Sequence, residues 1–159
     1  MIKRYPYRNL EWVDLDARRI IKKQKVMERF NIHPLVAEEL LLPSLKPKVD
    51  LYPNCIYLIL HFPAMKHTYA FHPNQEVDFV IGKDFLITTH YDTVDPLHKF
   101  GKVFEVNSIL EKQEIGEHAG YLFFYMISKL YQSLHHELDF LRDSLAENQN
   151  RGFNGDEIR

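Results

Sequence analysis

Nine histidines raise the question of a metal or catalytic site: His33, His61, His67, His72, His90, His98, His118, His135 and His136. Few of them have the spacing that such a site requires. His67 and His72 lie in a probable connection with no cysteine or second pair nearby. His135 and His136 are adjacent in a predicted helix, so their side chains point about 100° apart and do not share an ion as an i, i+4 pair does. The pattern favours scattered surface or hydrogen-bonded histidines.

Hydroxyl, imidazole and carboxylate groups follow one another over Thr88–Asp92, at the end of a predicted strand. A hydrolase acting through His90 and Asp92 would use groups of this kind. The chain has no Gly-x-Ser-x-Gly motif and no glycine-rich phosphate loop, and no second paired carboxylate accompanies the segment. We therefore interpret it as an ordinary strand end and expect no catalytic residues and no enzyme.

Two neighbouring acids, Glu38 and Glu39, follow an apolar segment that begins with a proline. Pro34 suits the first turn of a helix, because proline lacks only an N–H group that has no intrahelical partner there. The pattern predicts a short helix over Leu35–Leu41 with both carboxylates near its end. From the residues alone, such a pair is typical of a solvated surface.

Composition limits the classes of function. Basic and acidic residues nearly balance, at 20 against 22, which argues against a nucleic-acid partner. Hydrophobic residues make up 45% of the chain, enough for the core of one domain. The longest apolar stretches, Cys55–Leu60 and Tyr121–Ile127, fall short of the ~20 residues that a membrane helix needs. The single cysteine, Cys55, lies in an apolar run and predicts a buried thiol in a reducing cytosol.

The elements that would position these residues form an α/β pattern. We predict one domain over residues 1–147, with a mixed sheet of about four or five strands covered by helices and a long C-terminal helix. The predicted strands are Leu10–Leu15, Val49–Tyr52, Cys55–Phe62, Glu76–Ile81 and Phe85–Thr89. Besides the short helix already described, the predicted helices are Ala17–Phe30, one from about Pro96, and one from about Gly116 to Leu145.

The last helix is predicted from apolar residues at steps of three and four, from Ala119 to Leu145. A helix of about 30 residues spans roughly 45 Å, more than a compact domain of this size needs. We expect the first half, about Ala119–Leu130, to pack on the sheet. The second half should project and, in the full protein, pair with the following helix in an antiparallel hairpin. Without that helix its leucines should contact a neighbouring chain or leave the helix end mobile. Residues 148–159 are polar and should fray or form a loop.

An ordered set of segments resembles the cytoplasmic domain of the CorA magnesium transporter family. The resemblance covers roughly residues 10 to 147, with order and spacing kept. Its segments are Trp12–Leu15, Asn31–Leu40, Lys46–Asp50, Cys55–Leu60, Glu76–Gly82 and Phe85–His90.

The resemblance implies a cytoplasmic, metal-sensing regulatory domain of a divalent cation transporter, with magnesium as the first candidate ion and cobalt as the second. Members of the family are pentamers of identical protomers in the cell inner membrane. A stalk helix, two transmembrane helices and a Gly-Met-Asn loop follow the cytoplasmic domain in these proteins. This chain has no Gly-Met-Asn and no membrane segment. We therefore expect it to stop before the stalk, and to be soluble and at most weakly associated by itself.

The resemblance also implies a metal site. In the family, divalent ions bound between neighbouring cytoplasmic domains hold the channel shut, and one acidic ligand corresponds to Glu39. Glu38 is the second candidate. The family often has Asp at the position of Glu39, and the partner acid lies on the stalk helix of the next protomer. Carboxylate oxygens suit a hard ion such as Mg²⁺, so the expected ligand is a divalent cation, without another cofactor.

Two alternatives stay open at this stage. The zinc-transporting branch of the family shares the domain, and the sequence does not separate it from the magnesium branch. The second alternative is that the chain is a free-standing soluble interaction domain.

Overall fold

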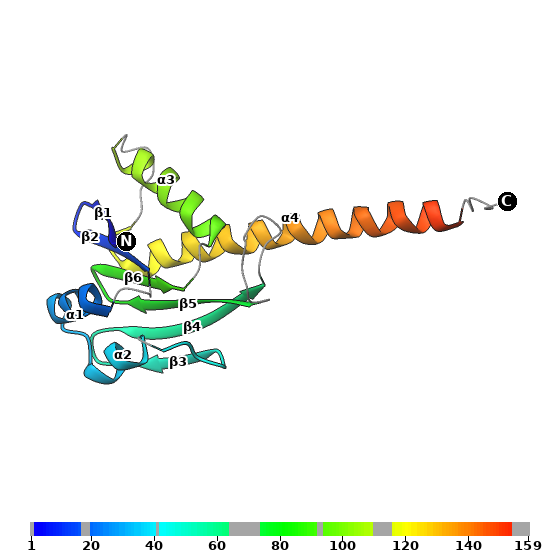
Figure 1. The fold of residues 1–159 in the computed structure, drawn as a ribbon. Coiled ribbons are helices and arrows are strands. Elements are labelled where there is room, and N and C mark those ends of the chain that lie inside the picture. Colours follow the sequence, from blue (N-terminus) through cyan, green and yellow to red (C-terminus); the bar gives the residue numbers. More distant parts are fainter. Residues whose placement is uncertain are drawn as a thin grey trace.

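The computed structural model describes residues 2–16, 20–40, 42–63, 74–91, 94–109 and 116–153, and it confirms the predicted α/β class (Figure 1). Over these residues, one mixed sheet has the spatial order β1-β2-β6-β5-β4-β3. Its strands are β1 (Ile2–Tyr7), β2 (Leu10–Asp16), β3 (Lys48–Leu51), β4 (Ile56–Pro63), β5 (Asn74–Ile81) and β6 (Phe85–His90). The helices are α1 (Ile20–Arg29), α2 (Pro34–Glu39), α3 (Asp95–Ile109) and α4 (Ala119–Phe153).

Strand β1 is the one that the sequence did not predict, and it raises the count from four or five strands to six. It pairs antiparallel with β2, from Ile2 opposite Leu15 to Tyr7 opposite Leu10. Arg8 closes the turn with a φ of 50°, the left-handed conformation of tight hairpin turns. Of the residues in β1 only Tyr7 is buried, so this edge strand lacks the apolar run that marks a buried strand.

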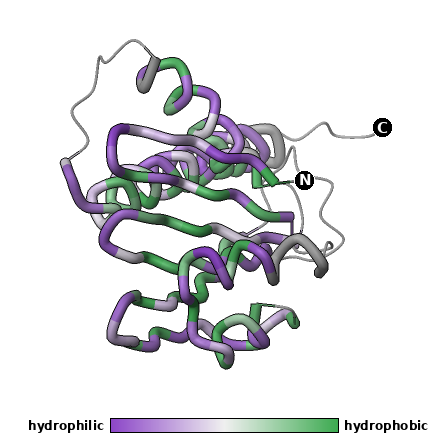
Figure 2. The backbone as a smooth tube through the Cα atoms, turned by 90° about the vertical axis from the view of Figure 1, so that its left-hand side faces the viewer, coloured by the Kyte–Doolittle hydropathy of each residue, from purple (hydrophilic) through white to green (hydrophobic). Residues whose placement is uncertain are grey.

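The centre of the sheet is the parallel pair of β2 and β6, in which Asp14 lies opposite Thr88 and Asp16 opposite His90. The predicted hairpin of β5 and β6 is confirmed, with antiparallel pairing from Ile81 opposite Leu86 to Val77 opposite His90. Hydrophobic residues are concentrated along the central strands (Figure 2).

Each face of the sheet has its own hydrophobic core, because side chains alternate between the faces of a strand. Helices α3 and α4 cover one face, and α1 and α2 cover the other (Figure 1). The first core includes Trp12, Phe79, Leu86, Phe104, Leu122 and Met126. The second includes Val13, Val36, Leu40, Tyr57, Ile59 and Ile87. Cys55 belongs to the second core, which confirms the predicted buried thiol.

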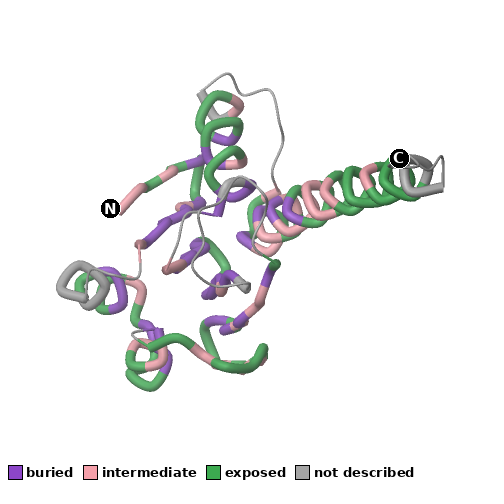
Figure 3. Tube along the Cα trace, turned by 45° about the vertical axis from the view of Figure 1, so that its right-hand side comes forward, coloured by how far each residue is buried: buried purple, intermediate pink, exposed green. Residues whose placement is uncertain are grey.

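Helix α4 changes character along its length, as predicted. Ala119, Leu122, Met126 and Leu130 are buried on the sheet. Beyond the sheet the helix projects, and Leu138, Leu141 and Leu145 are more than half exposed (Figure 3). The expectation of a frayed or looped segment from residue 148 is wrong as far as Phe153, because α4 continues to that residue. Residues 154–159 lie outside the described part.

Over the described ranges, no helix combines the length and the hydropathy of a membrane-spanning segment.

Candidate functional site: the end of helix α2 and strand β3

The two acids singled out by the sequence lie at the end of α2. His33 caps the helix, with its Nδ1 atom accepting from the Leu35 N–H at 3.3 Å, and Pro34 occupies the first turn as predicted. Val36 and Leu40 anchor the helix in the core. This anchoring leaves the carboxyl-terminal end of the helix at the molecular surface.

Glu39 faces strand β3, and Glu38 is exposed. The Lys48 ammonium lies between two carboxylates, 2.5 Å from Glu39 Oε2 and 2.7 Å from Asp50 Oδ2. Lys48 and Asp50 share one face of β3, since they are two positions apart on a strand. Glu39 and Asp50 thus form a site for a cation, and the ammonium group of Lys48 occupies it.

Three features keep Lys48 charged and in place. The hydrogen bonds that its ammonium donates to Asp50 and Glu39, together with the charges of both carboxylates, hold the pKa of Lys48 above its usual range. The ammonium lies 5.5 Å from the centre of the Tyr57 ring, within the range of a cation–π contact. The carboxyl-terminal end of a helix carries a partial negative charge, so the position of Glu39 at the end of α2 also favours a cation.

A divalent ion at Glu39 would need more ligands than this corner supplies. The described residues contain no group of three or more histidine, cysteine, aspartate or glutamate side chains placed to hold a metal ion. Glu39 and Asp50 offer oxygen donors that fit a hard divalent cation, but Lys48 lies between them. The chemistry of the donors therefore fits, while the ligand count requires donors from elsewhere.

A second group of polar side chains lies deeper on the same face. Glu76 Oε2 accepts from the Ser44 N–H at 2.7 Å and lies 3.3 Å from His61 Nε2. Tyr57 is fully buried, and its hydroxyl has no hydrogen-bond partner among the described residues. Burial, and then the nearby charges of Asp78 and other acids, raise the pKa of Tyr57 well above its usual value. Tyr57 therefore stays a neutral phenol among these acids.

The strand end with His90 forms a network on the opposite face. His90 Nε2 lies 3.2 Å from Asp14 Oδ1, to which the Thr88 hydroxyl donates at 2.7 Å. The Trp12 indole donates to the Thr88 oxygen at 3.0 Å. Burial alone would raise the pKa of Asp14, but the hydrogen bond and charge of His90, the Thr88 hydrogen bond and the Lys3 charge together hold it below its usual range.

This network ties β2 to β6, and its one hydroxyl, that of Thr88, is fully buried between Trp12 and Asp14, so it is out of reach of a substrate. Asp92, the predicted partner of His90, lies outside the described residues, as do His67 and His72. His135 and His136 are exposed on α4.

Sequence reasoning named Glu39 but gave no role to Lys48 and Asp50, which complete its surroundings. One signal in the sequence could have revealed them. Charged and apolar residues alternate in Lys48-Val49-Asp50, and this alternation places both charged side chains on one face of an edge strand. The partnership of Asp14 with His90 was also missed, because the parallel pairing of β2 and β6 joins segments more than 70 residues apart.

A six-stranded mixed sheet with helices on both faces and one helix that projects beyond it defines an α/β domain. The family model described as CorA-like Mg²⁺ transporter protein matches residues 8–156, and the chain belongs to this family. A search of curated protein sequences gave no significant match.

Three solved structures share the fold. Full-length CmaX superimposes with a TM-score of 0.77 at 10% identity, over 94% of this chain and 44% of that one. The soluble domain of CorA from Methanocaldococcus jannaschii gives 0.69 at 17% identity, over 92% and 57%. The ZntB cytoplasmic domain from Vibrio parahaemolyticus RIMD 2210633 gives 0.64 at 14% identity, over 89% and 54%. The chain spans about half the length of these structures, and identities this low establish the fold alone.

Proposed function

We propose that this chain is the metal-sensing regulatory domain, on the cytoplasmic side, of an inner-membrane divalent cation transporter that works as a pentamer. The domain itself does no catalysis. The observation that carries the proposal is that Glu39 and Asp50, at the end of α2, together hold a positive charge, the ammonium group of Lys48. Membership of the CorA-like family supports the transport role.

In this proposal a divalent cation displaces the Lys48 ammonium from Glu39 and takes its remaining ligands from another copy of the chain. Carboxylates that face each other across an interface repel, and a bound cation bridges them. The ion then favours the assembled state over the loosened state, as a regulatory ligand must. Glu38 is exposed on the same helix, but consecutive helix residues point about 100° apart, so Glu38 contributes a nearby negative charge and no direct ligand.

Magnesium is the ion that the donor set favours. Glu39 and Asp50 provide only oxygen atoms, whereas zinc sites in proteins usually include histidine or cysteine. The likeness to the ZntB cytoplasmic domain keeps the zinc-transporting branch as the second candidate. A free-standing interaction domain is the third.

Titration of the isotope-labelled chain with MgCl₂, followed by NMR, tests the proposal. Because one chain offers few ligands, we expect weak binding, with a dissociation constant of about 1 mM or higher, and amide shifts centred on α2 and β3. Glu39→Gln should abolish these shifts, whereas Glu38→Gln, the matched neighbour, should weaken them only slightly. Shifts that persist in Glu39→Gln, or a Zn²⁺ response stronger than the Mg²⁺ response at the same residues, would refute the assignment.

A further inference from the structure

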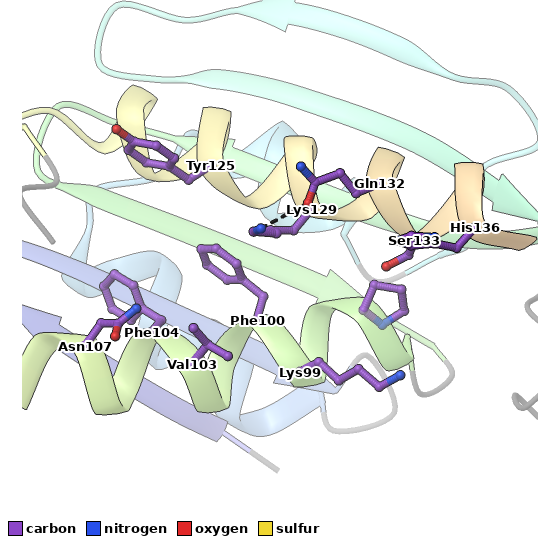
Figure 4. Close-up of a pocket in the computed structure, with 11 residues that line it drawn as sticks. Lys99, Phe100, Val103, Phe104, Asn107, Tyr125, Lys129, Gln132, Ser133 and His136 are labelled. Carbon is purple, nitrogen blue, oxygen red and sulfur yellow. Dashed lines mark hydrogen bonds between the residues drawn. The ribbon is translucent and has the colours of Figure 1, made fainter. Parts of the chain in front are cut away.

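A groove of about 350 Å³ lies between α3 and α4, on the face of the sheet opposite to Glu39 (Figure 4). This volume is at the lower end of the range of about 300–1,000 Å³ that small-molecule sites occupy. Four of its apolar side chains are Phe100, Val103 and Phe104 of α3 and Tyr125 of α4. Three of these are aromatic, so the lining suits a flat ring, which packs well against other rings in offset or edge-to-face arrangements.

The charged side chains that line the groove are two lysines, one from each helix. Lys99 belongs to α3 and Lys129 to α4, and His136 of α4 adds an imidazole. Among the described residues that form the lining there is no aspartate or glutamate. The groove therefore attracts an anion. Aromatic walls on both sides lower the local dielectric, which strengthens the attraction relative to an open lysine in water.

The Lys129 side chain is already directed into the groove. Its ammonium donates a hydrogen bond to Gln132 Oε1 at 3.0 Å, and both side chains lie on the side of α4 that faces Phe100 (Figure 4). An ammonium group has three N–H donors, so the bond to Gln132 leaves donors for an acid group in the groove. Because this bond already restricts the side chain, a ligand loses less entropy when it binds there.

We propose that this groove is a binding site for a small aromatic acid with one negative charge. Its ring packs against the aromatic side chains of the groove, and its carboxylate accepts hydrogen bonds from Lys129. Such a ligand contacts both helices, so it fixes α3 relative to α4, the helix whose far half projects from the domain. The site uses none of the residues around Glu39 and does not depend on metal binding.

NMR spectra of the isotope-labelled 159-residue chain, titrated with 2-naphthoate, test the proposal. We expect a dissociation constant of about 0.1–1 mM for a ligand of this size, with amide shifts centred on α3 and the first half of α4. The neutral alcohol 2-naphthalenemethanol has the same ring without the charge and should bind at least about fivefold more weakly. Acetate has the charge without the ring and should cause no shifts there at the same concentrations.

Three variants assign the two halves of the ligand to their partners. Lys129→Met should remove the preference for 2-naphthoate over the alcohol and leave the affinity for the alcohol unchanged. Lys102→Met is the matched control, because Lys102 is exposed on α3 outside the lining of the groove, and it should keep the preference. Val103 is 56% exposed, so Val103→Trp places a large side chain in the groove without disturbing the core and should abolish the binding of both ligands.

Three results would overturn the proposal. Equal affinity of the wild-type chain for the acid and the alcohol would make the groove an apolar surface without selectivity for an anion. A preference that survives in Lys129→Met would place the carboxylate elsewhere. Shifts centred on the exposed apolar side chains of β3, Val49 and Leu51, would show that the ring binds another surface. The Mg²⁺ titrations at Glu39 report on a separate site, so the two proposals fail independently.

Discussion

Lys48 Nζ lies 2.5 Å from Glu39 Oε2, so the carboxylate that the family resemblance suggested as a metal ligand holds a cation from its own chain. Asp50 approaches the same ammonium at 2.7 Å. An ammonium carries one charge and a divalent ion carries two, so the ion gains more from the paired carboxylates once Lys48 moves aside. This relationship makes Lys48 a competitor of the proposed ligand and predicts that its removal strengthens metal binding.

The two halves of α4 should differ in their contribution to stability. Leu122 is fully buried, so Leu122→Ala should lower the free energy of unfolding by about 2–5 kcal/mol. Leu141 is 54% exposed, and Leu141→Ala should cost less than about 1 kcal/mol. Urea denaturation of the two variants, compared at equal protein concentration, measures the difference. Equal large losses would show that the projecting half is buried in solution.

The Tyr57 hydroxyl should be dispensable for folding. It is buried without a hydrogen-bond partner among the described residues, and a buried unpaired hydroxyl costs about 1–3 kcal/mol. Tyr57→Phe should therefore leave stability unchanged or raise it by about 1 kcal/mol. Thr88→Val is the contrasting variant, because the Thr88 hydroxyl bonds to both Trp12 and Asp14, and it should destabilise. Thermal denaturation that ranks Tyr57→Phe below Thr88→Val would contradict this.

Asp14 should make stability depend on pH in the acid range. Its folded-state pKa is lowered, so its contribution is present above the unfolded pKa of about 3.9 and is lost as the pH falls through the folded value. Asp14→Asn removes this contribution and should cost about 1–3 kcal/mol at pH 7. The gap between wild type and variant should shrink toward pH 3. A gap that stays constant from pH 7 to pH 3 would mean that the folded and unfolded states titrate alike at Asp14.

The sequence predicted those features that depend on local pattern. The alternation in β5, with Val77 and Phe79 on one face, and the apolar run of β4 specify their strands without knowledge of the neighbours. The apolar stripe from Ala119 to Leu145 predicted helix α4. It also predicted the two halves of the helix, because a helix of this length extends beyond the sheet and its far half is then exposed.

What the sequence did not reveal depends on contacts between distant segments. Strand β1 exists because its backbone pairs with β2, and its own sequence has neither an apolar run nor a regular alternation of polar and apolar residues. At the candidate site, Glu39 was named by resemblance, whereas the approach of Lys48 depends on how the end of α2 packs against β3. An ion pair between two different elements of the fold leaves no periodic pattern along the sequence.

Calorimetric titration of Lys48→Met with MgCl₂ tests the central claim most directly. Methionine keeps much of the length of the lysine stem but has no charge, so Glu39 and Asp50 lose their internal cation. We predict that Lys48→Met binds Mg²⁺ at least about tenfold more tightly than the wild-type chain, and that adding Glu39→Gln removes the gain. Unchanged Mg²⁺ affinity in a folded Lys48→Met chain would contradict a cation site at Glu39.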